Sequence, residues 1–320
     1  MKSEWRFIWK RLLMAVPTLV FVSALTFVAA ELAPSDPIQV MAGEHATPEA
    51  VARLRHEYGL DRPAYVRFAS FVWGAVRLDF GRSFFDPRPV RDIILQTYGP
   101  TALLACLAMC IAATAGIALG IVAAVNAGRR IDRLVVVMAV AGLGVPNFVL
   151  APLLVLVFAL HLEWAEVAGW GDPSRGLLPY LVLPVLVLAV RPMAAVMRLT
   201  RTAMIDSLSG DFIRTARAKG VSRWGVVFRH ALPNALTPTL IVIGTSFGYL
   251  LTGSFIVETA FAIPGLGYRA IQAIQQRDYP MIQATTVLFA AAFVLVNLLV
   301  DIVQARVDPR VRADIRRRSA

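Results

Sequence analysis

Apolar residues gather in six long runs along the chain, and most charged residues lie between them. The runs cover about residues 8–30, 101–125, 134–160, 177–199, 236–257 and 282–304. A bilayer core roughly 30 Å thick needs about 20 apolar residues per helix, so each run is long enough to cross it. Because water is absent there, each run must satisfy its own backbone groups, which a helix does alone. The pattern predicts an all-α polytopic membrane protein with six transmembrane helices.

The segment 31–97 is too long to be a structureless loop. Thr47 followed by Pro48 is typical of a helix start, with a capping side chain and a first residue that needs no hydrogen-bond partner. Gly59 suits the end of the same helix. We expect a second amphipathic helix after it and a third over 90–98, which enters the second apolar run. This small cap either packs as a lid over the bundle or docks an outer partner.

The distribution of charge predicts the orientation. The chain has 58% hydrophobic residues, a mean hydropathy of +0.65 and a net charge of +11. With the N-terminus inside, the inner segments carry twenty Lys and Arg and the outer segments eleven. The positive-inside rule then places both termini in the cytoplasm. A nucleic-acid-binding protein would need one continuous basic face with interleaved aromatic residues, so we expect no nucleic acid as a partner. The apolar stretch 12–30 exceeds the length of a cleaved signal and is interpreted as a retained helix.

One segment matches a hydrolase pattern. Gly244-Thr-Ser-Phe-Gly248 has the form G-x-S-x-G, which places its serine on a strained turn between a strand and a helix. Here it lies inside an apolar run with no strand before it. All four histidines fall in predicted loops, so Ser246 lacks a predicted base at membrane depth. We predict no catalytic residues, and an intramembrane serine hydrolase stays as an alternative.

Other chemistry is missing from the sequence. The chain contains no Gly-Lys pair, so it lacks the G-x-x-x-x-G-K-[ST] loop that binds ATP. His56-Glu57 begins like a zinc-protease motif, but Leu60 stands where its second histidine belongs. Cys106 and Cys110 lie one turn apart in an apolar run and are interpreted as packing residues. We expect no metal and no cofactor, and energy for transport must come from elsewhere.

Two features inside the apolar runs are candidates for a translocation path. Gly142, Gly144 and Pro146 predict a kink in the third run, and kinked helices either line pathways or are simply tolerated. Arg191 lies in the fourth run, where a central arginine costs roughly 2.5–3.5 kcal/mol to insert. Its long side chain either snorkels toward Leu199, the predicted inner end of the run, or faces a cavity. Gly116-x-x-x-Gly120 and Gly244-x-x-x-Gly248 are expected to allow close helix packing.

The basic segment 206–233 predicts a helix–glycine–helix element on the inner side. Asp206 or Ser209 is expected to cap the first helix, and Gly220 suits its left-handed end. Ser222 is expected to cap a second short helix that stops at Pro233. Small alanines would let the first helix seat closely in a groove of a partner. The alternative is a basic helix that faces solvent or lipid headgroups.

The residues of this element resemble a known loop signature. Arg214-Thr215-Ala216-x-x-x-Gly220, nine residues and then His230-Ala231-Leu232-Pro233 are similar to the signature of binding-protein-dependent ABC importer permeases. The common form begins Glu-Ala-Ala, and Arg-Thr-Ala is usual in the peptide and nickel branch. Further stretches resemble the first, B-type permease of dipeptide and oligopeptide importers. They are Pro34-Ser-Asp-Pro37, Tyr58-Gly-Leu-Asp-Arg-Pro63, Asp79-Phe-Gly-Arg-Ser83, Pro264-Gly-Leu-Gly267 and Arg277-Asp-Tyr-Pro280.

The resemblance implies a type I ABC importer permease fold and a set of partners. These are a second, similar permease, two ABC ATPase subunits, an extracytoplasmic substrate-binding protein and the lipid of a bacterial inner membrane. It implies that ATP hydrolysis occurs in the partners and drives alternating access. The solute is left open among dipeptides, oligopeptides, glutathione and nickel. A secondary transporter would instead need inverted repeats and ionisable residues at the membrane midplane.

The resemblance also implies a division of the chain and roles for named residues. We expect 1–97 to form the first transmembrane helix and an outer cap, 98–308 the permease domain with a coupling helix at 213–220, and 309–320 a basic cytoplasmic tail. The residues assigned to ATPase coupling are Arg214, Thr215, Ala216, Arg217, Ala218, Lys219, Gly220, Leu232 and Pro233. The residues assigned to a gate or translocation path are Pro146, Arg191, Pro264, Gly265 and Gly267.

Overall fold

The computed structural model describes residues 2–32, 37–43, 46–172, 174 and 176–307. Within these ranges the chain is helical, with two isolated β-bridges and no β-strand, which confirms the all-α class. Most of the predicted motif 34–37 and the whole predicted tail 309–320 lie outside the described residues.

Among the described residues, five helices are long and apolar enough to cross a membrane. They are α1 (Lys2–Leu32), α5 (Val90–Val125), α8 (Leu178–Ser209), α11 (Leu232–Gly253) and α14 (Tyr279–Val307). The pair α6 (Arg130–Gly144) and α7 (Asn147–Leu154), the latter extended by the π-helix η1 (Val155–His161), makes a sixth span if it is counted as one.

The third predicted span is broken rather than gently kinked. Its two halves meet at an angle of 106°. Pro146 lies at the break and caps α7, and Val145 before it has an extended backbone with ψ of 117°. A residue that precedes proline is driven out of the helical region, and this explains why α6 ends there.

The expected helix over 90–98 does enter the second span, and α5 runs unbroken through Pro100. One predicted boundary was wrong. The fourth span does not end at Leu199, because α8 continues to Ser209. Ser209 therefore closes α8, where its hydroxyl donates to the Asp206 carbonyl, and neither residue caps the next helix.

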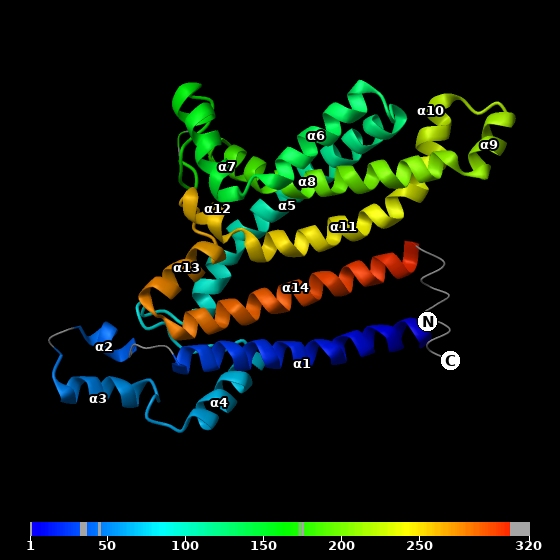
Figure 1. Ribbon diagram of the computed structural model, residues 1–320. Coiled ribbons are helices and arrows are strands. Elements are labelled where there is room, and N and C mark those ends of the chain that lie inside the picture. Colours follow the sequence, from blue (N-terminus) through cyan, green and yellow to red (C-terminus); the bar gives the residue numbers. More distant parts are fainter. Residues whose placement is uncertain (1, 33–36, 44–45, 173, 175, 308–320) are drawn as a thin grey trace.

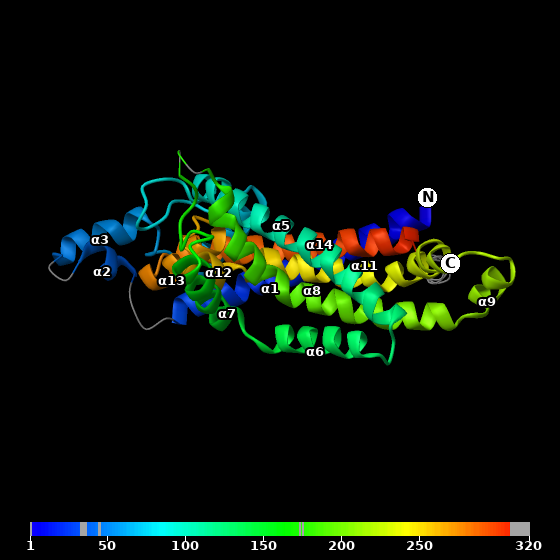
Figure 2. The same ribbon diagram turned by 90° about the horizontal axis from the view of Figure 1, so that it is seen from above.

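The long helices α1, α8, α11 and α14 run alongside one another between the same two ends of the molecule (Figure 1). α8 packs along α5 and α11, α11 along α14, and α14 along α1. The pair α6–α7 lies outside this layer against α8, as the view from above shows (Figure 2). The start of α1, the end of α14 and the short helix α9 (Asp211–Ala218) lie at one end of the molecule, which we call the inner end (Figure 1).

Glycines set the closest helix contacts, as predicted. A side chain at Gly116 would approach the Met193 carbonyl oxygen to 2.8 Å, and one at Gly120 would approach that of Met197 to 2.9 Å. α5 and α8 therefore touch backbone to backbone. Gly244 lies equally close to Val300 of α14. Small residues at such positions allow helices to pack in lipid, where no hydrophobic driving force brings them together.

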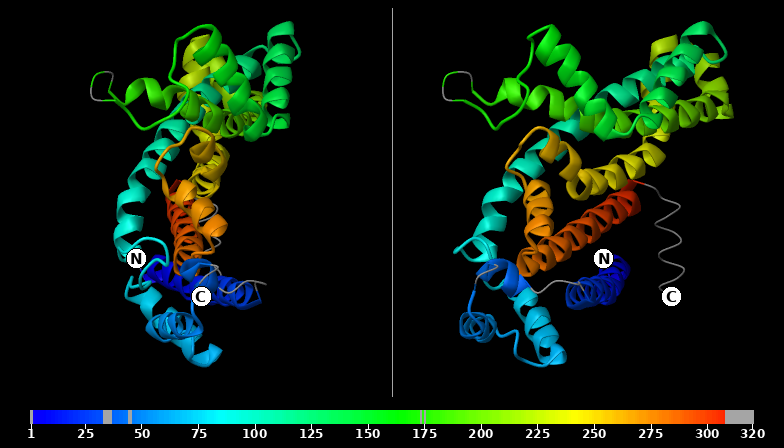
Figure 3. Two further views of the ribbon diagram at one scale, coloured as in Figure 1. Left: turned by 90° about the vertical axis from the view of Figure 1, so that its left-hand side faces the viewer. Right: turned by 60° about the vertical axis from the view of Figure 1, so that its left-hand side comes forward.

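The opposite, outer end carries short helices. They are α2 (Pro37–Ala42), α3 (Pro48–Glu57), α4 (Ala64–Val76), α12 (Phe255–Ala260) and α13 (Leu266–Gln276). The predicted cap of α3 is confirmed, because Thr47 Oγ1 accepts from the Ala50 amide, and Gly59 has φ of +65°. α4 packs against the outer part of α1, and α2 and α3 lie further out (Figure 1; seen from that end in Figure 3). α12 and α13 were not predicted.

Candidate functional site

The inner element begins with α9, which is fixed to the bundle by its apolar face. Ile213 and Ala216 are buried in a cluster with residues of α5, α8 and the π-helix η2 (Val226–Ala231). Gly220 has φ of +80° and its amide donates to the Arg217 carbonyl, while the Val221 amide donates to the Ala216 carbonyl. This pair of bonds is the Schellman motif, so the predicted left-handed helix end is confirmed.

The outward face of α9 is basic and exposed. Its exposed residues are Asp211, Phe212, Arg214, Thr215, Arg217 and Ala218, and the exposed Lys219 and Gly220 follow it. Arg214 makes a weak contact of 3.4 Å with Asp211 on the same face. Next to it Ser222 caps α10 (Arg223–Gly225). The rings of Trp224 in α10 and Phe228 in η2 stack with their centroids 5.8 Å apart, and both side chains are largely exposed. Basic and aromatic side chains therefore project together from the inner end.

Two predicted details of this element differ from the structure. Ala216 is 6% exposed, so its small side chain seats α9 against the chain's own helices and is covered from outside. Pro233 does not stop a helix: η2 leads directly into α11, and Pro233 lies in the first turn of α11. Proline is tolerated there because a first-turn amide needs no intrahelical partner. Leu232 packs against the buried cluster below α9, whereas Pro233 is exposed.

An ion pair ties the inner ends of two helices together. Arg201 of α8 donates through Nε to Asp132 Oδ1 at 2.5 Å and through Nη2 to Asp132 Oδ2 at 2.8 Å. The Gly128 amide donates to the same carboxylate at 2.8 Å. Asp132 is 3% exposed. Because the fork of arginine matches both carboxylate oxygens, the pair fixes the start of α6 on α8.

A cavity of about 700 Å³ opens at the break between α6 and α7. α8 contributes one helical face to it with Leu188, Arg191, Pro192 and Ala195. α11 contributes another face with Ser246, Tyr249, Leu250 and Gly253. Pro146 and Asn147 line it at the break, and Phe255 and Ile256 of α12 close one side. The structure thus brings together two predicted path residues, Pro146 and Arg191, and favours a cavity-facing Arg191 over one that snorkels to the membrane surface.

A buried carboxylate, which the sequence analysis missed, holds the outer loop after α12. Glu258 has no exposed surface. It accepts from Thr101 Oγ1 at 2.8 Å, Ser254 Oγ at 2.6 Å and the Tyr268 amide at 2.9 Å. Thr101 Oγ1 also accepts from the Leu266 amide at 2.8 Å. This cluster, the Glu258 clamp, joins α5, α12 and the start of α13.

The clamp explains the two glycines predicted for the outer gate. A side chain at Gly265 would collide with the Glu258 carboxylate and with Thr101. One at Gly267 would lie 2.7 Å from Phe255 Cα and 2.9 Å from Glu258 Oε2. Pro264 lies between the buried Ile263 and Gly265. Gly265 and Gly267 are needed because the backbone runs directly against a carboxylate and a neighbouring helix.

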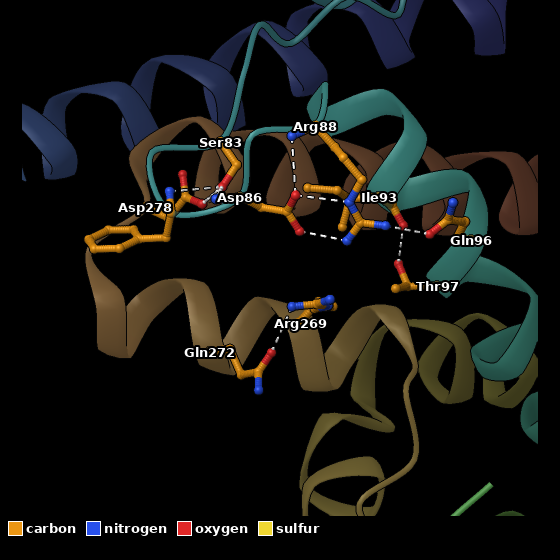
Figure 4. Close-up of polar contacts among 10 residues, drawn as sticks. Ser83, Asp86, Arg88, Ile93, Gln96, Thr97, Arg269, Gln272 and Asp278 are labelled. Carbon is orange, nitrogen blue, oxygen red and sulfur yellow. Dashed lines mark hydrogen bonds and ion pairs between the residues drawn. The ribbon is translucent and has the colours of Figure 1, made fainter. Parts of the chain in front are cut away.

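A second buried carboxylate joins two of the quoted motifs at the outer end (Figure 4). Ser83 Oγ and the Phe84 amide donate to Asp278, which lies between α13 and α14. The Met281 amide donates to it at 3.4 Å. Burial raises the pKa of Asp278 above its ordinary value, although these donors oppose the shift. We call this group the Asp278 corner.

The rest of the outer loop is ordered around the same corner. Asp86 accepts from Arg88 through both of its oxygens, and this bonding lowers the pKa of Asp86 to about 2. Arg88 also donates to Gln96 of α5 at 2.8 Å (Figure 4). The ring centroid of Phe84 lies 4.9 Å from that of Tyr58 and 6.5 Å from that of Tyr279, both in edge-on geometry. Three motifs that are far apart in the sequence therefore converge on one outer surface.

The serine of the hydrolase pattern lacks a base. Ser246 lies within α11 and lines the cavity, but no His, Lys, Asp or Glu is among the described residues that line it. The histidines predicted to fall between the apolar runs lie in short helical segments, His56 in α3, His161 in η1 and His230 in η2. None of the three lines the cavity with Ser246. His45 lies outside the described residues.

Comparison with known proteins agrees with the resemblance. Residues 116–313 match the family of binding-protein-dependent transport system inner membrane components, and residues 4–105 match the N-terminal part of such membrane components. A probable peptide ABC transporter permease of Sinorhizobium fredii is 39% identical over 309 residues, which cover 96% of this chain and 99% of that protein. A glutathione transport system permease of Escherichia coli K12 is 41% identical over 306 residues, covering 96% and 98%.

Two solved structures share the fold. One is an amino acid ABC transporter with histidines, with a TM-score of 0.54 and 18% identity over 67% of this chain and 94% of that one. The other is an inward-facing methionine ABC transporter, with a TM-score of 0.53 and 18% identity over 69% and 95%. At this identity the likeness concerns the fold, which is that of a type I permease. The chain therefore belongs to the binding-protein-dependent inner membrane components and is a multi-pass permease subunit of an ABC importer.

Proposed function

We propose that this permease imports peptides or a related small solute and that α9 is its coupling helix. The observation that carries the proposal is the build of α9: its apolar face is buried in the bundle, and its outward face is basic and exposed. A helix held so firmly transmits a push to α5, α8 and α11, which contact the same cluster. The peptide permease of Sinorhizobium fredii and the glutathione permease of Escherichia coli, both relatives of this chain, support the solute class.

We further propose the assembly and its orientation. ABC importer permeases associate with ATPase and substrate-binding components. Here one of two ATPase subunits receives α9, a second permease completes the pathway, and a binding protein docks at the outer end. Both termini then lie in the cytoplasm, as the excess of inner Lys and Arg favours. A glutathione or nickel importer of the same family is the alternative for the solute.

The Gly220→Glu variant tests the coupling role. Gly220 is exposed on the surface of the inner end, with no atom within 4 Å of an added side chain. A carboxylate there would meet the partner surface that the basic face contacts, so we expect ATP-driven uptake to be abolished while membrane insertion is retained. Uptake is measured in cells that carry the full transporter, and insertion by the amount of protein in the membrane fraction.

Gly128→Glu is the matched control. Gly128 also has a positive φ, of +78°, with no atom within 4 Å, but it lies in the connection between α5 and α6. Both variants strain a left-handed position to a similar extent. We expect Gly128→Glu to keep most of the uptake. Normal uptake in Gly220→Glu, or equal loss in both variants, would refute the assignment of α9.

A further inference from the structure

Arg191 is a cation without a partner in the described part of the chain. It is exposed, it lines the cavity at the α6–α7 break, and none of the described residues gives it a hydrogen bond or an ion pair. By contrast, Arg201, ten residues further along α8, is held by both oxygens of Asp132. The helix therefore pairs one of these arginines and leaves the other open to the cavity.

An unpaired arginine at this depth is unfavourable in lipid. It lies 13 residues, or about 20 Å, from the outer start of α8 at about 1.5 Å per residue. Charged side chains within spans mostly face a water-filled cavity or a counter-charge. No Asp or Glu is among the described residues that line this cavity. The described residues of this cavity therefore supply no negative charge to complement Arg191.

A second polar group in the same cavity also lacks a partner. Asn147 Oδ1 is buried and, among the described residues, has no hydrogen bond. A buried polar atom without a partner costs about 1–3 kcal/mol. Asn147 begins α7 immediately after the break and lines the same cavity as Arg191 of α8. The site thus offers a guanidinium and a nearby amide, both unsatisfied.

The size and position of the cavity suit a solute in passage. Its volume of about 700 Å³ falls within the 300–1,000 Å³ range of small-molecule sites. Its α12 wall leads through Phe255 to the Glu258 clamp at the outer end, because Gly267 packs on Phe255 and on Glu258. The cavity therefore lies inward of the loop through which a solute from the outer end must pass.

We propose that Arg191 binds the carboxylate of the solute during translocation, with Asn147 bonding to its polar backbone. This proposal rests on the proposed function and narrows the solute class to carboxylates, such as peptides with a free C-terminus. Arg191 forms charge-assisted hydrogen bonds to a carboxylate, in two-pronged geometry if both oxygens are free. A bare Ni²⁺ ion would be repelled by the same charge. Arg191 selects against that cargo.

The test measures ATP-driven uptake by proteoliposomes that contain the complete transporter and its binding protein. The probes are trialanine and glutathione, which carry free carboxylates, and trialaninamide, which has none. For the two carboxylate probes we expect uptake to fall in the order wild type, Arg191→Lys, Arg191→Gln, Arg191→Glu. The loss of a charged hydrogen bond predicts about tenfold slower uptake in Arg191→Gln. For trialaninamide the three variants should match wild type.

Arg198→Gln is the matched control. Arg198 lies two turns further on the same helix, is exposed and does not line the cavity. We expect the Arg198→Gln transporter to take up trialanine and glutathione as fast as wild type. Stimulation of ATP hydrolysis by the binding protein should persist in all variants, which shows that they fold and assemble.

Three outcomes would overturn the proposal. Equal uptake in wild type and Arg191→Gln removes the role of the charge. Equal loss for the acid and amide probes, or loss of co-purifying second permease, assigns Arg191 to subunit pairing. Efficient import of Ni²⁺ without a chelator contradicts the solute class. If the wild-type transporter imports neither peptide nor glutathione, the proposed function fails and this inference fails with it.

Discussion

The two ends of this permease are stabilised in different ways. At the inner end, an apolar cluster around Ile213 and Ala216 holds α9, and its polar side chains point outward. At the outer end, the loops are held by buried carboxylates, Glu258 and Asp278, which accept hydrogen bonds from segments far away in the sequence. The inner element rests on hydrophobic contact, whereas the outer loops rest on polar contacts inside the protein.

The difference suits different mechanical tasks. An apolar seat buries surface without directional bonds, so the exposed face of α9 is free to vary with its partner. A buried carboxylate must have every donor in place, because each unmet partner costs about 1–3 kcal/mol. The Glu258 clamp therefore fixes the loop in one geometry or releases it altogether. Such all-or-none behaviour suits the outer gate predicted at Pro264–Gly267, and rigid attachment suits the coupling role proposed for α9.

The largest expected effect is the removal of Glu258. Glu258→Ala leaves the hydroxyls of Thr101 and Ser254 and the amide of Tyr268 without their acceptor inside the protein. We expect a loss of about 3 kcal/mol or more in the free energy of unfolding. The purified permease complex in detergent is unfolded by heat, and the fall in Tm is measured.

Two variants sharpen this comparison between the ends. Glu258→Gln keeps the shape and one acceptor, so it should lose less than the alanine variant. Arg214→Ala removes an exposed charge from the inner end, where surface changes usually stay within about 0.5 kcal/mol. If the Tm of Glu258→Ala falls no further than that of Arg214→Ala, the clamp does not stabilise the outer end.

The inner element could be predicted from the sequence because its signals are local. Gly220 at the helix end and Ser222 at the next cap each act within a few residues, and both are confirmed. The apolar runs likewise follow from composition. Local sequence signals failed where contacts with residues far away in the sequence determine where a helix begins or ends. Pro233 lies in the first turn of α11 directly after η2, and α8 continues beyond Leu199 into a stretch where Arg201 pairs with Asp132.

The outer site could be predicted only in part. The Pro264–Gly267 motif marked the region, but its reason lies in Glu258, Thr101 and Phe255, two of which are close in sequence and one 157 residues from Glu258. Spacing carries no information about such a pair. The one available signal was a lone acidic residue, Glu258, inside an apolar stretch. Arg191 was found because a charge in an apolar run is visible, but its cavity needed the structure.

A moderate effect is expected at the inner end from Gly220→Ala. Gly220 has φ of +80°, where a Cβ costs about 1 kcal/mol, and the surrounding space is open, so the backbone strain alone should appear. Thermal unfolding of the purified complex measures the change, and a stabilising Gly220→Ala would contradict the left-handed helix end.

The smallest expected effect is a dependence on pH at the Asp278 corner. Burial raises the pKa of Asp278 in the folded state above its ordinary value of 3.8. A carboxyl of this kind adds stability that is complete below pH 3.8 and is lost as the pH rises through the raised value. Asp86 has the opposite effect, because its hydrogen bonds from Arg88 lower its pKa to about 2. The stability that Asp86 contributes to the folded protein is lost as the pH falls toward that value.

A comparison of wild type with Asp278→Asn separates these opposing contributions, because Asp86 and the other acids are common to both proteins. Asparagine cannot ionise and still accepts from the Phe84 amide. The Tm of wild type relative to Asp278→Asn should therefore rise as the pH is lowered from 7 to 4. A difference that stays constant over this range would mean that Asp278 has an ordinary pKa. Its burial would then be fully offset by its three donors, and the outer end would tolerate a charge as readily as the outward face of α9 does.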